Sequence, residues 1–422
     1  MSKVAVIGCG YVGLATAATL SHLGHHVVAA EVNPDRLVLL REGRSPILED
    51  GLEDLLREGL AKGTLEFVDD AAIAAEGAEF AFLCVQTPMS DDGRADLTWV
   101  EAAVREIGPV LERGAIVVTK STVPVGSSRV VGRVLHREDV SVVSNPEFLQ
   151  EGAAVHDSLH PSRIVIGSDD QAAAIRVAGL FEEIQAPLVI TDPASAETIK
   201  YASNSFLAMK VSFVNAVAAL SEAVGADVAD VVVGMGYDHR IGAEFLKPGP
   251  GWGGSCFPKD VRAMRAIADD AGYDFHLLDA VIAVNDEQFD RVVDKIEQGA
   301  GGTLDGATVA VWGLTFKART ADVRESPSIE IVRRLVAKGA TIRAYDPTVI
   351  APLDGITVVG DAYEACAGAD VLAVLTEWDE FRWLDFDRVA EAMAGRSVVD
   401  GRNLLESAAL RRLGFEYQGI GR

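Results

Sequence analysis

The sequence is poor in cysteine and in aromatic residues, and its charge balance is acidic rather than basic. Its 422 residues include four cysteines, at positions 9, 84, 256 and 366, with no CxxC pair and no metal-ligand spacing. Such sparse cysteines exclude a disulfide framework and a cysteine metal centre, and they are typical of a reducing compartment. We therefore predict a cytoplasmic protein without a metal site.

The formal net charge of −25 argues against two classes of partner. Nucleic acids and anionic membrane surfaces are both recognised by basic surfaces. No apolar run approaches the roughly 20 residues of a membrane span, and the first residues, MSKVAVIGCG, read as a strand rather than a signal peptide. We expect no nucleic acid and no membrane partner, while an anionic small molecule would need local basic contacts.

Strand-like and helical segments alternate twice along the chain, which predicts an α/β fold with parallel sheets. The length predicts two to three domains. We expect two Rossmann-like parallel-sheet domains joined by a long central helix, with domains over 1–192, 193–300 and 301–422. The apolar strand-like runs cover residues 3–9, 26–31, 79–85, 115–120, 140–148, 307–314, 340–346, 371–376 and 396–402.

A G-x-G-x-x-G motif directly follows the first strand and precedes a helical stretch. Its glycines are Gly8, Gly10 and Gly13, in the strand–turn–helix context that dinucleotide binding requires. The second strand ends at Glu31, where a carboxylate binds a ribose 2′-hydroxyl and repels a 2′-phosphate. The alternative for Glu31 is a solvated strand end. We predict NAD as the cofactor, with Arg36 beside the adenosine.

Polar residues follow several later strands of the first series. Thr87, Thr122 and the segment NPEFLQEG over 145–152 all stand at carboxyl ends of predicted strands. These ends meet at one edge of a parallel sheet, which is where ligands bind in such folds. We therefore expect these residues at the ligand site.

One long helix is expected from Pro193 to Val224, because the segment is alanine-rich and has neither an internal proline nor a break. A helix of roughly 30 residues is ~45 Å long and needs more than one small domain to bury it. We expect it to connect two domains and to form a dimer surface. Lys200 and Asn204 share one of its faces, although an isolated pair of this kind is normally solvated.

The glycine-dense stretch GPGWGGSCFPKD over 249–260 holds the strongest candidate nucleophile, Cys256. The thiolate is the reactive form of cysteine, and Lys259 supplies a nearby cation. The other three cysteines lie in apolar segments, where a buried small hydrophobe is the simpler interpretation. NAD and a nucleophilic thiol together permit oxidation of an alcohol or aldehyde to a carboxylate through a thiohemiacetal and a thioester.

A basic loop lies between the first strand and the first helix of the second series. Lys317, Arg319 and Arg324 stand close together there in an otherwise acidic chain. Such a cluster at a strand-to-helix junction suggests an anion site, and a solvated basic loop is the alternative.

Several motifs together resemble the UDP-glucose 6-dehydrogenases of the UDP-glucose/GDP-mannose dehydrogenase family. The resemblance runs in the family's order from residue 8 to about 402, and it implies four-electron oxidation of UDP-glucose at C6, giving UDP-glucuronate and two NADH. It also implies an N-terminal NAD-binding domain and a C-terminal UDP-sugar-binding domain. The motifs are GCGYVGL, KSTVPVG, NPEFLQEG, ETIKYASNSFLAMK, RIG, GPGWGGSCFPKD and FKARTADVRESPS.

The resemblance also implies roles for individual residues. Cys256 would be the nucleophile, Lys200 and Asn204 would hold the C6 oxygen as an oxyanion-type pair, and Asp260 would handle protons through a water. Glu147 would assist hydrolysis, with Thr122 positioning the water. The cofactor contacts expected from motif and resemblance are Gly8, Gly10, Val12, Gly13, Glu31, Arg36, Thr87, Thr122, Glu151, Lys259 and Arg324.

The substrate contacts implied by the resemblance come from three parts of the chain. Arg240 would reach across a homodimer to the neighbour's substrate, and Lys317 would arrive from the C-terminal domain. The full set is Glu147, Phe148, Leu149, Gln150, Glu151, Lys200, Asn204, Arg240, Phe245, Leu246, Lys247, Pro248, Gly249, Gly253 and Lys317.

The sequence departs from the family pattern at two places and leaves the sugar nucleotide open. Glu31 stands where Asp is more frequent, and Gln86 stands where small residues or Asn are frequent, so the local NAD contacts would differ slightly. Ser255 before the cysteine disfavours a UDP-N-acetylhexosamine substrate, and Phe257 after it disfavours GDP-mannose. A non-catalytic nucleotide-sugar or NAD sensor is disfavoured because all the catalytic groups are present.

Overall fold

The structure is a computed structural model that describes residues 1–90 and 93–422. It divides into two compact units. Unit 1 comprises residues 1–203 and 262–271, and unit 2 comprises residues 204–261 and 272–422. The boundaries fall inside two helices, α9 (Pro193–Val224) and α11 (Phe257–Asp270).

Unit 1 is built on a sheet with the strand order β3-β2-β1-β4-β5-β6-β7-β8 among the residues described. Every neighbouring pair is parallel except β6 and β7, which meet antiparallel at Ser144 and Gly167. The central strands β4 and β5 are buried along their whole length, because helices cover both faces of the sheet. The strands are β1 (Lys3–Ile7), β2 (His26–Ala30), β3 (Leu65–Val68), β4 (Phe80–Leu83), β5 (Ile116–Thr119), β6 (Ser141–Ser144), β7 (Ile164–Gly167) and β8 (Leu188–Thr191).

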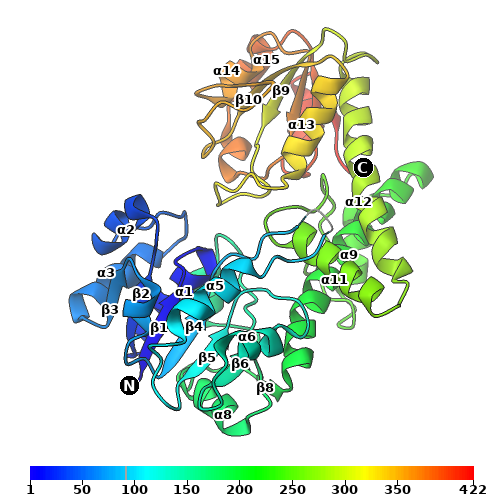
Figure 1. Cartoon of the computed structure of the whole chain (residues 1–422). Helices are drawn as coiled ribbons and strands as arrows, with labels where there is room; N and C mark the ends of the chain where they lie inside the picture. The colour runs from blue at the N-terminus through cyan, green and yellow to red at the C-terminus, as the bar shows by residue number, and fades with distance from the viewer. Residues whose placement is uncertain (91–92) are drawn as a thin grey trace. The chain divides into compact units, whose positions relative to one another are not determined.

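Two layers of helices cover this sheet (Figure 1). One hydrophobic cluster packs α1, α2, α3 and α8 against one face. A second cluster packs α4, α5 and α6 against the other face. The helices are α1 (Tyr11–His22), α2 (Pro34–Arg41), α3 (Leu52–Lys62), α4 (Ala71–Ala75), α5 (Thr98–Ile107), α6 (Ser127–Leu135), α7 (Ala154–Leu159) and α8 (Gln171–Gly179).

Unit 2 has its own sheet, with the strand order β11-β10-β9-β12-β13-β14 and only parallel pairs among the residues described. Its strands are β9 (Thr308–Trp312), β10 (Thr341–Tyr345), β11 (Ile356–Val358), β12 (Val371–Val374), β13 (Ser397–Asp400) and β14 (Glu416–Gln418). Its helices, besides parts of α9 and α11, are α10 (Val228–Gly236), α12 (His276–Gly299), α13 (Pro327–Ala337), α14 (Ala362–Cys366), α15 (Phe386–Ala392), α16 (Ser407–Arg412) and the 3-10 helix η1 (Asp379–Trp383).

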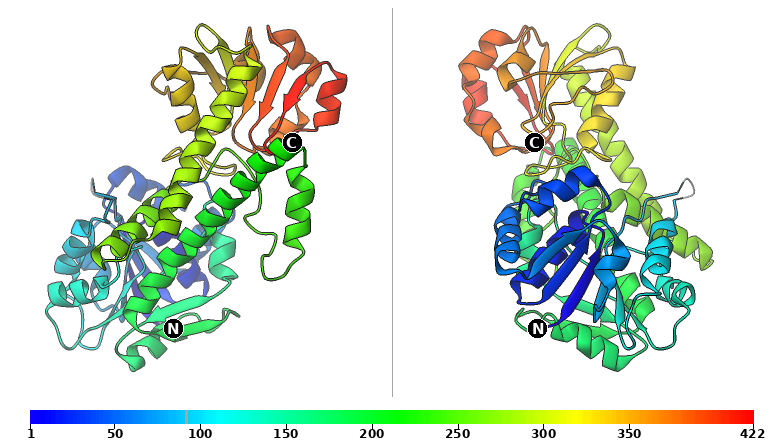
Figure 2. Two further views of the ribbon diagram at one scale, coloured as in Figure 1. Left: turned by 90° about the vertical axis from the view of Figure 1, so that its right-hand side faces the viewer. Right: turned by 60° about the vertical axis from the view of Figure 1, so that its left-hand side comes forward.

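Helix α9 is a single unbroken helix of 32 residues, about 48 Å long at 1.5 Å per residue, as Figure 2 shows in green. By length and composition alone it is apolar enough to cross a membrane, and 33% of its apolar window is buried inside the protein. Its buried positions include Glu197, Lys200 and Asn204, each hydrogen-bonded within its unit. Such buried, bonded polar groups are what a connecting core helix carries.

The predicted fold class is confirmed: two parallel-dominated α/β sheets and a long central helix. The bounds of α9 are those expected from the sequence. The helical segment over residues 257–299 is two helices. Helix α11 begins at Phe257 and ends at Asp270, and Gly272, with a left-handed φ of 71°, separates it from α12. The proposed division into three domains stays a prediction.

Candidate active site

The turn between β1 and α1 has the geometry that a dinucleotide requires. Gly8 has a φ of 94°, and its N–H donates to the carbonyl of Ala30 at 3.0 Å. A Cβ at Gly13 would overlap the carbonyl oxygen of Gly8, so only glycine lets the helix start this close to the strand. The N-cap residue Gly10 supplies no side-chain cap, which leaves the first N–H groups of α1 for a ligand's phosphates.

The acidic residue predicted for the ribose lies at the end of β2. Glu31 is buried, and one of its carboxylate oxygens accepts a hydrogen bond from the N–H of Asn33 at 2.9 Å. Arg36 Nε lies 3.3 Å from the other oxygen, and its Nη2 donates to the carbonyl of Cys9 at 2.6 Å. The structure thus brings Glu31 and Arg36 together beside the glycine turn, and both are suited to an adenosine ribose.

The two predicted threonines lie together where β4 and β5 end. Thr87 Oγ1 donates to the carbonyl of Thr122 at 2.8 Å, and Ser121 Oγ donates to the carbonyl of Val85 at 2.6 Å. These bonds join two strand ends that are 35 residues apart in the sequence. The shared position that the strand pattern predicted is therefore present in unit 1.

Glu147 and Lys200 form a buried ion pair in unit 1. Lys200 Nζ lies 2.7 Å from Glu147 Oε1, with side-chain exposures of 4% and 5%, and the N–H of Leu149 donates to Glu147 Oε2 at 2.6 Å. Burial acts to raise the pKa of Glu147, but the charge and hydrogen bond of Lys200, with help from Leu149 and Lys120, outweigh it and hold that pKa below its usual value. Glu147 is therefore ionised at neutral pH.

The NPEFLQEG segment is attached to the first turn of α1 through two residues that sequence reasoning missed as a pair. The hydroxyl of Tyr11 contacts Glu49, and the N–H of Gly152 donates to Tyr11 Oη at 2.7 Å and to Glu49 Oε2 at 2.8 Å. Burial and the neighbouring Glu49 both raise the pKa of Tyr11. Contacts between residues 103 and 141 positions apart leave no local signal in the sequence.

In unit 2, Cys256 immediately precedes the first residue of α11, and its carbonyl accepts the N–H of Asp260 at 2.9 Å. The carboxylate of Asp260 is fully buried. It accepts hydrogen bonds from Asn204 Nδ2 and from Lys259 Nζ, both at 2.6 Å. The structure thus brings Asn204, Lys259 and Asp260 together within one turn of the cysteine in the sequence, and it shows Lys259 in an ion pair with Asp260.

The glycine-rich stretch is held by buried amides on α9 and α12. Asn215 Oδ1 accepts the N–H of Gly249, and Gln288 Nε2 donates to the carbonyl of Gly249, both at 2.8 Å. The side chain of Asn285 bonds both the N–H and the carbonyl of Trp252. None of these three amides was predicted, although each is a polar residue on an otherwise apolar helix face, which is a usable signal.

The remaining predicted substrate residues of unit 2 differ in how deeply they are buried. Leu246 and Gly249 are buried, and the ring of Phe245 lies 6.1 Å from that of Phe257. A Cβ at Gly253 would overlap the carbonyl oxygen of Glu325, so this glycine permits close packing of the loop after β9. Lys247 is exposed and Pro248 half-buried.

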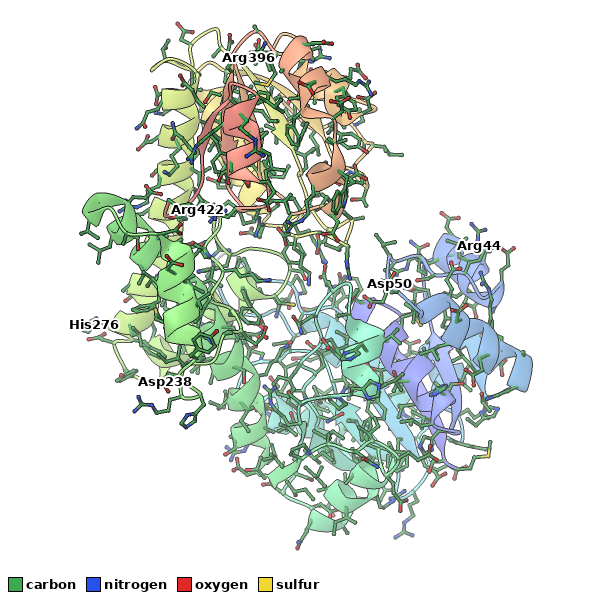
Figure 3. The ribbon with its side chains drawn as sticks, turned by 180° about the vertical axis from the view of Figure 1, so that it is seen from behind. Arg44, Asp50, Asp238, His276, Arg396 and Arg422 are labelled. Atoms are coloured by element: carbon green, nitrogen blue, oxygen red, sulfur yellow. The ribbon has the colours of Figure 1, made fainter. Side chains whose placement is uncertain are left out.

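The predicted basic residues each have a partner within unit 2. Arg324 is paired with Asp322 at 2.6 Å, and the ammonium of Lys317 lies 5.6 Å from the ring of Phe316. Arg240 is exposed and paired at 2.5 Å with Asp238, a residue on the outer surface in Figure 3. Both arginine side chains are mostly exposed.

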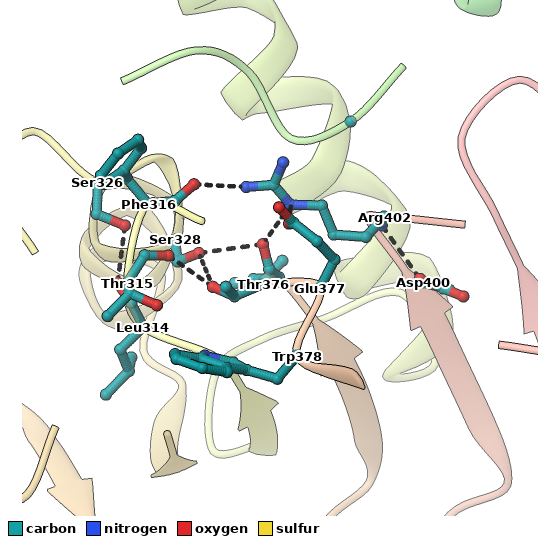
Figure 4. A network of polar contacts seen from close by, with 12 residues as sticks. Leu314, Thr315, Phe316, Ser326, Ser328, Thr376, Glu377, Trp378, Asp400 and Arg402 are labelled. Carbon is teal, nitrogen blue, oxygen red and sulfur yellow. Dashed lines mark hydrogen bonds and ion pairs between the residues drawn. The ribbon is translucent and has the colours of Figure 1, made fainter. Parts of the chain in front are cut away.

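Arg402 is a candidate that the sequence reading missed. It follows β13 and donates from Nε to the carbonyl of Leu375 at 2.9 Å. Its Nη2 donates to the carbonyl of Phe316 at 2.8 Å, and its Nε pairs with Glu377 at 2.9 Å, as Figure 4 shows. A Cβ at Gly249 would lie 3.5 Å from its Nη1. A basic side chain at a strand's carboxyl end, next to two predicted substrate segments, suits a phosphate or a ribose.

The four cysteines divide as predicted. Cys9, Cys84 and Cys366 are buried, whereas Cys256 is only half-buried. Burial is the main cause that raises the pKa of the Cys84 thiol to about 12 and that of Cys366 to about 12, and it also raises that of Cys9. Three thiols are therefore unreactive at neutral pH, and Cys256 stands apart from them.

The glycine turn with Glu31, the buried lysine–carboxylate pair and the cysteine at the start of α11 define the class of protein: an NAD-dependent dehydrogenase with a second nucleotide-binding fold. Profiles of one family cover most of the chain. The NAD binding domain of the UDP-glucose/GDP-mannose dehydrogenase family matches residues 2–185, its central domain residues 194–287 and its UDP binding domain residues 310–407. The chain belongs to this family.

Individual relatives agree with this assignment. The chain is 43% identical to the UDP-glucose 6-dehydrogenase of Rhizobium meliloti (strain 1021), covering 100% of this chain and 99% of the relative. A solved UDP-glucose dehydrogenase from Pyrobaculum islandicum is 37% identical with a TM-score of 0.91, covering 100% of this chain and 98% of the other. A UDP-D-ManNAc dehydrogenase from Pyrococcus horikoshii is 27% identical with a TM-score of 0.90, covering 99% of both chains.

Proposed function

We propose that the chain is a UDP-glucose 6-dehydrogenase, which oxidises the C6 alcohol of UDP-glucose to the carboxylate of UDP-glucuronate. Per sugar, two NAD⁺ and one water are consumed, and two NADH and three protons are released. The observation that carries the proposal is the half-buried Cys256 beside the bonded set of Asn204, Lys259 and Asp260. Full-length identity of 43% to a UDP-glucose 6-dehydrogenase supports the choice of substrate.

The residues of unit 1 fit NAD. The overlap that any Cβ at Gly13 would cause and the uncapped start of α1 favour a pyrophosphate at this turn. Glu31 and Arg36 would hold the adenosine ribose. When bound, the cofactor would accept one hydride from C6 in each oxidation. Thr87, Thr122 and Glu151 would contact its nicotinamide half.

The protein groups would supply the covalent and proton-transfer chemistry. Lys200 and Asn204 lie four residues apart on α9 and would donate to the C6 oxygen as negative charge develops there. The Cys256 thiolate would add to the aldehyde carbon, and loss of the second hydride would leave a thioester. Glu147 would then activate the water that breaks the C–S bond, and Asp260 would take protons through a water.

The NPEFLQEG segment, the Phe245–Gly249 segment, Gly253 and Lys317 would contact the sugar nucleotide as predicted, with Arg402 added by its position beside Gly249. GDP-mannose and UDP-N-acetylhexosamines are the alternative substrates. The N-terminal, central and C-terminal parts would act as NAD-binding, connecting and UDP-sugar-binding domains.

A substrate panel tests the proposal. Purified protein with NAD would be given UDP-glucose, GDP-mannose, UDP-galactose and UDP-N-acetylhexosamines, and NADH formed per sugar would be measured. We expect turnover of UDP-glucose with two NADH per sugar. One NADH per sugar would refute the two-step reaction, and no turnover of UDP-glucose would refute the substrate. A Cys256→Ser variant with wild-type turnover would remove Cys256 from the mechanism.

A cytoplasmic homodimer is part of the proposal. Phe206, Phe213 and Leu220 follow one another at seven-residue spacing on α9, and all three are more than half exposed. An apolar seam of this spacing suits packing against another helix, and a second copy of α9 supplies one. Sedimentation velocity would show a dimer for the native chain and a monomer for Phe213→Lys; a native monomer would refute the dimer.

A further inference from the structure

Lys120 is a lysine of unit 1 to which the proposed reaction assigns no role. It follows β5 directly, and its exposed part faces a cavity of about 250 Å³ that is also lined by Asn145 and Glu147. Within the described part of the chain, no carboxylate lies at ion-pair distance from its ammonium. A lysine held in such a place without a salt-bridge partner costs folding free energy, and a functional role would offset that cost.

The ammonium of Lys120 is attached to the start of the NPEFLQEG segment. Lys120 Nζ donates to Asn145 Oδ1 at 3.0 Å, and Asn145 Nδ2 donates to the carbonyl of Val165 at 2.8 Å. The N–H of Asn145 donates in turn to the carbonyl of Thr119 at 2.9 Å. Asn145 is 1% exposed, so this chain of bonds fixes the backbone two residues before Glu147.

The charge of Lys120 also acts on Glu147. Two cations lower the pKa of Glu147: Lys200 on α9, which is directly bonded, and Lys120, which acts through space. Burial lowers the pKa of Lys120, while Glu147 and Cys84 oppose that shift and Lys200 adds to it. The Cys84 thiol, after β4, is neutral because burial raises its pKa to about 12.

Three further titratable side chains line the same cavity: Asp157, His160 and Arg163. The guanidinium of Arg163 stacks over the ring of Phe148, 3.6 Å from its centroid, and Asp157 accepts from the N–H of Gln150 at 3.0 Å. Arg163 and Asp157 thus contact residues that follow Glu147 in the sequence. Lys120 is the cation of this wall that is bonded to the residues preceding Glu147.

We propose that Lys120 is a positioning residue of the oxidation: it fixes the strand end that carries Glu147 and supplies the second positive charge that keeps Glu147 ionised. The inference rests on the proposed function, because it gives Glu147 the role of base. A purely structural lysine would fill the cavity and brace Asn145, and its loss would lower stability without changing how Glu147 titrates.

The test separates charge from hydrogen bonding. Lys120→Met removes both, Lys120→Arg keeps the charge, and Asn145→Ala removes the hydrogen-bond acceptor while keeping the ammonium. Lys62→Met is the control, since Lys62 lies on α3 and is exposed. The readout is the pH dependence of kcat for UDP-glucose oxidation, because Glu147 is proposed to act in the hydrolysis of the thioester. Circular dichroism and NAD binding report that each variant is folded.

Removing a nearby cation raises the pKa of a carboxyl group. The acid limb of the pH profile should therefore move to higher pH in Lys120→Met, by about one pH unit for the loss of one nearby positive charge. Lys120→Arg and Lys62→Met should keep the wild-type limb. Asn145→Ala should lower kcat without moving the limb. An unmoved limb in folded Lys120→Met would overturn the proposal.

A second readout does not depend on the substrate. The folded-state pKa of Glu147 lies below its ordinary value, so its contribution to stability is present above the unfolded-state pKa and is lost as pH falls through the folded one. Urea unfolding across this acid range should show a smaller loss of stability for Lys120→Met than for the wild type. If the wild type failed to oxidise UDP-glucose but this difference in stability appeared, the proposed function would be wrong and the electrostatic coupling of Lys120 to Glu147 would be supported. Equal losses of stability would overturn the coupling.

Discussion

The two sheets share one topology but use it differently at the end of their first strand. The order β3-β2-β1-β4-β5-β6 in unit 1 is repeated by β11-β10-β9-β12-β13-β14 in unit 2. Gly8 follows β1 with a φ of 94°, and Gly313 follows β9 with a φ of 91°. Their N–H groups donate to the matching carbonyls of Ala30 and Tyr345. The backbone turn is therefore the same in both.

The acidic residue after the second strand has a different task in each sheet. In the part of the chain that the structure describes, the carboxylate of Glu31 is bonded to the N–H of Asn33 and to Arg36, so it does not hold the start of α1. Asp346 instead accepts hydrogen bonds from the N–H groups of Leu314 and Thr315, at 2.8 and 3.1 Å. The second sheet thus uses its carboxylate to hold its own loop.

The consequence is visible in the length of the connection. Helix α1 starts at Tyr11, three residues after Gly8, whereas α13 starts only at Pro327. The longer loop carries Lys317 and Arg324, and its polar network of Ser326, Ser328 and Thr376 is drawn in Figure 4. One fold therefore places an uncapped helix end close to its first strand in unit 1 and a longer, side-chain-bearing loop there in unit 2.

The largest effect is expected from adding one methyl group at each glycine turn. In Gly13→Ala the Cβ overlaps the carbonyl of Gly8, so NAD affinity should fall at least about 100-fold, or about 2.7 kcal/mol. In Gly313→Ala the Cβ overlaps Thr376, so unit 2 should lose stability while NAD affinity is kept. Calorimetric NAD titration and urea unfolding measure both. Equal loss of NAD affinity in the two variants would contradict the comparison.

A smaller effect is expected from the two acidic residues. Asp346→Asn weakens bonds to two buried N–H groups and should lower the free energy of unfolding by about 1–3 kcal/mol, with a raised KM for UDP-glucose and unchanged NAD affinity. Glu31→Gln should leave unfolding nearly unchanged and weaken NAD binding about tenfold, with a gain for NADP. The comparison fails if Glu31→Gln, and not Asp346→Asn, destabilises the fold.

The smallest effect is a difference in thiol labelling. Iodoacetamide should modify Cys256 first, because burial raises the pKa of Cys84 in unit 1 and of Cys366 in unit 2. Cys84 and Cys366 should react only when their unit opens, so their slow rates, resolved by mass spectrometry, report the stability of unit 1 and unit 2 separately. Rapid labelling of Cys84 or Cys366 in native protein would show that its unit is open.

Local sequence determined much of this protein. The glycine turn, the strand–helix alternation and the span of α9 are set by neighbouring residues, because backbone conformation and helical periodicity act over a few positions. Cys256 could be chosen from the sequence because its neighbours are glycines and polar residues, while the other cysteines stand among apolar ones.

Tertiary structure alone decided the partners of the buried polar groups. The bonds of Tyr11 and Glu49 to Gly152, of Gln288 to Gly249 and of Lys120 to Asn145 join residues far apart in the sequence. The position of Arg402 beside Gly249 was likewise decided by the tertiary structure. So was the difference between the contacts of Glu31 and those of Asp346. A buried donor must find an acceptor wherever the fold brings one, and no periodicity in the chain records which one that is.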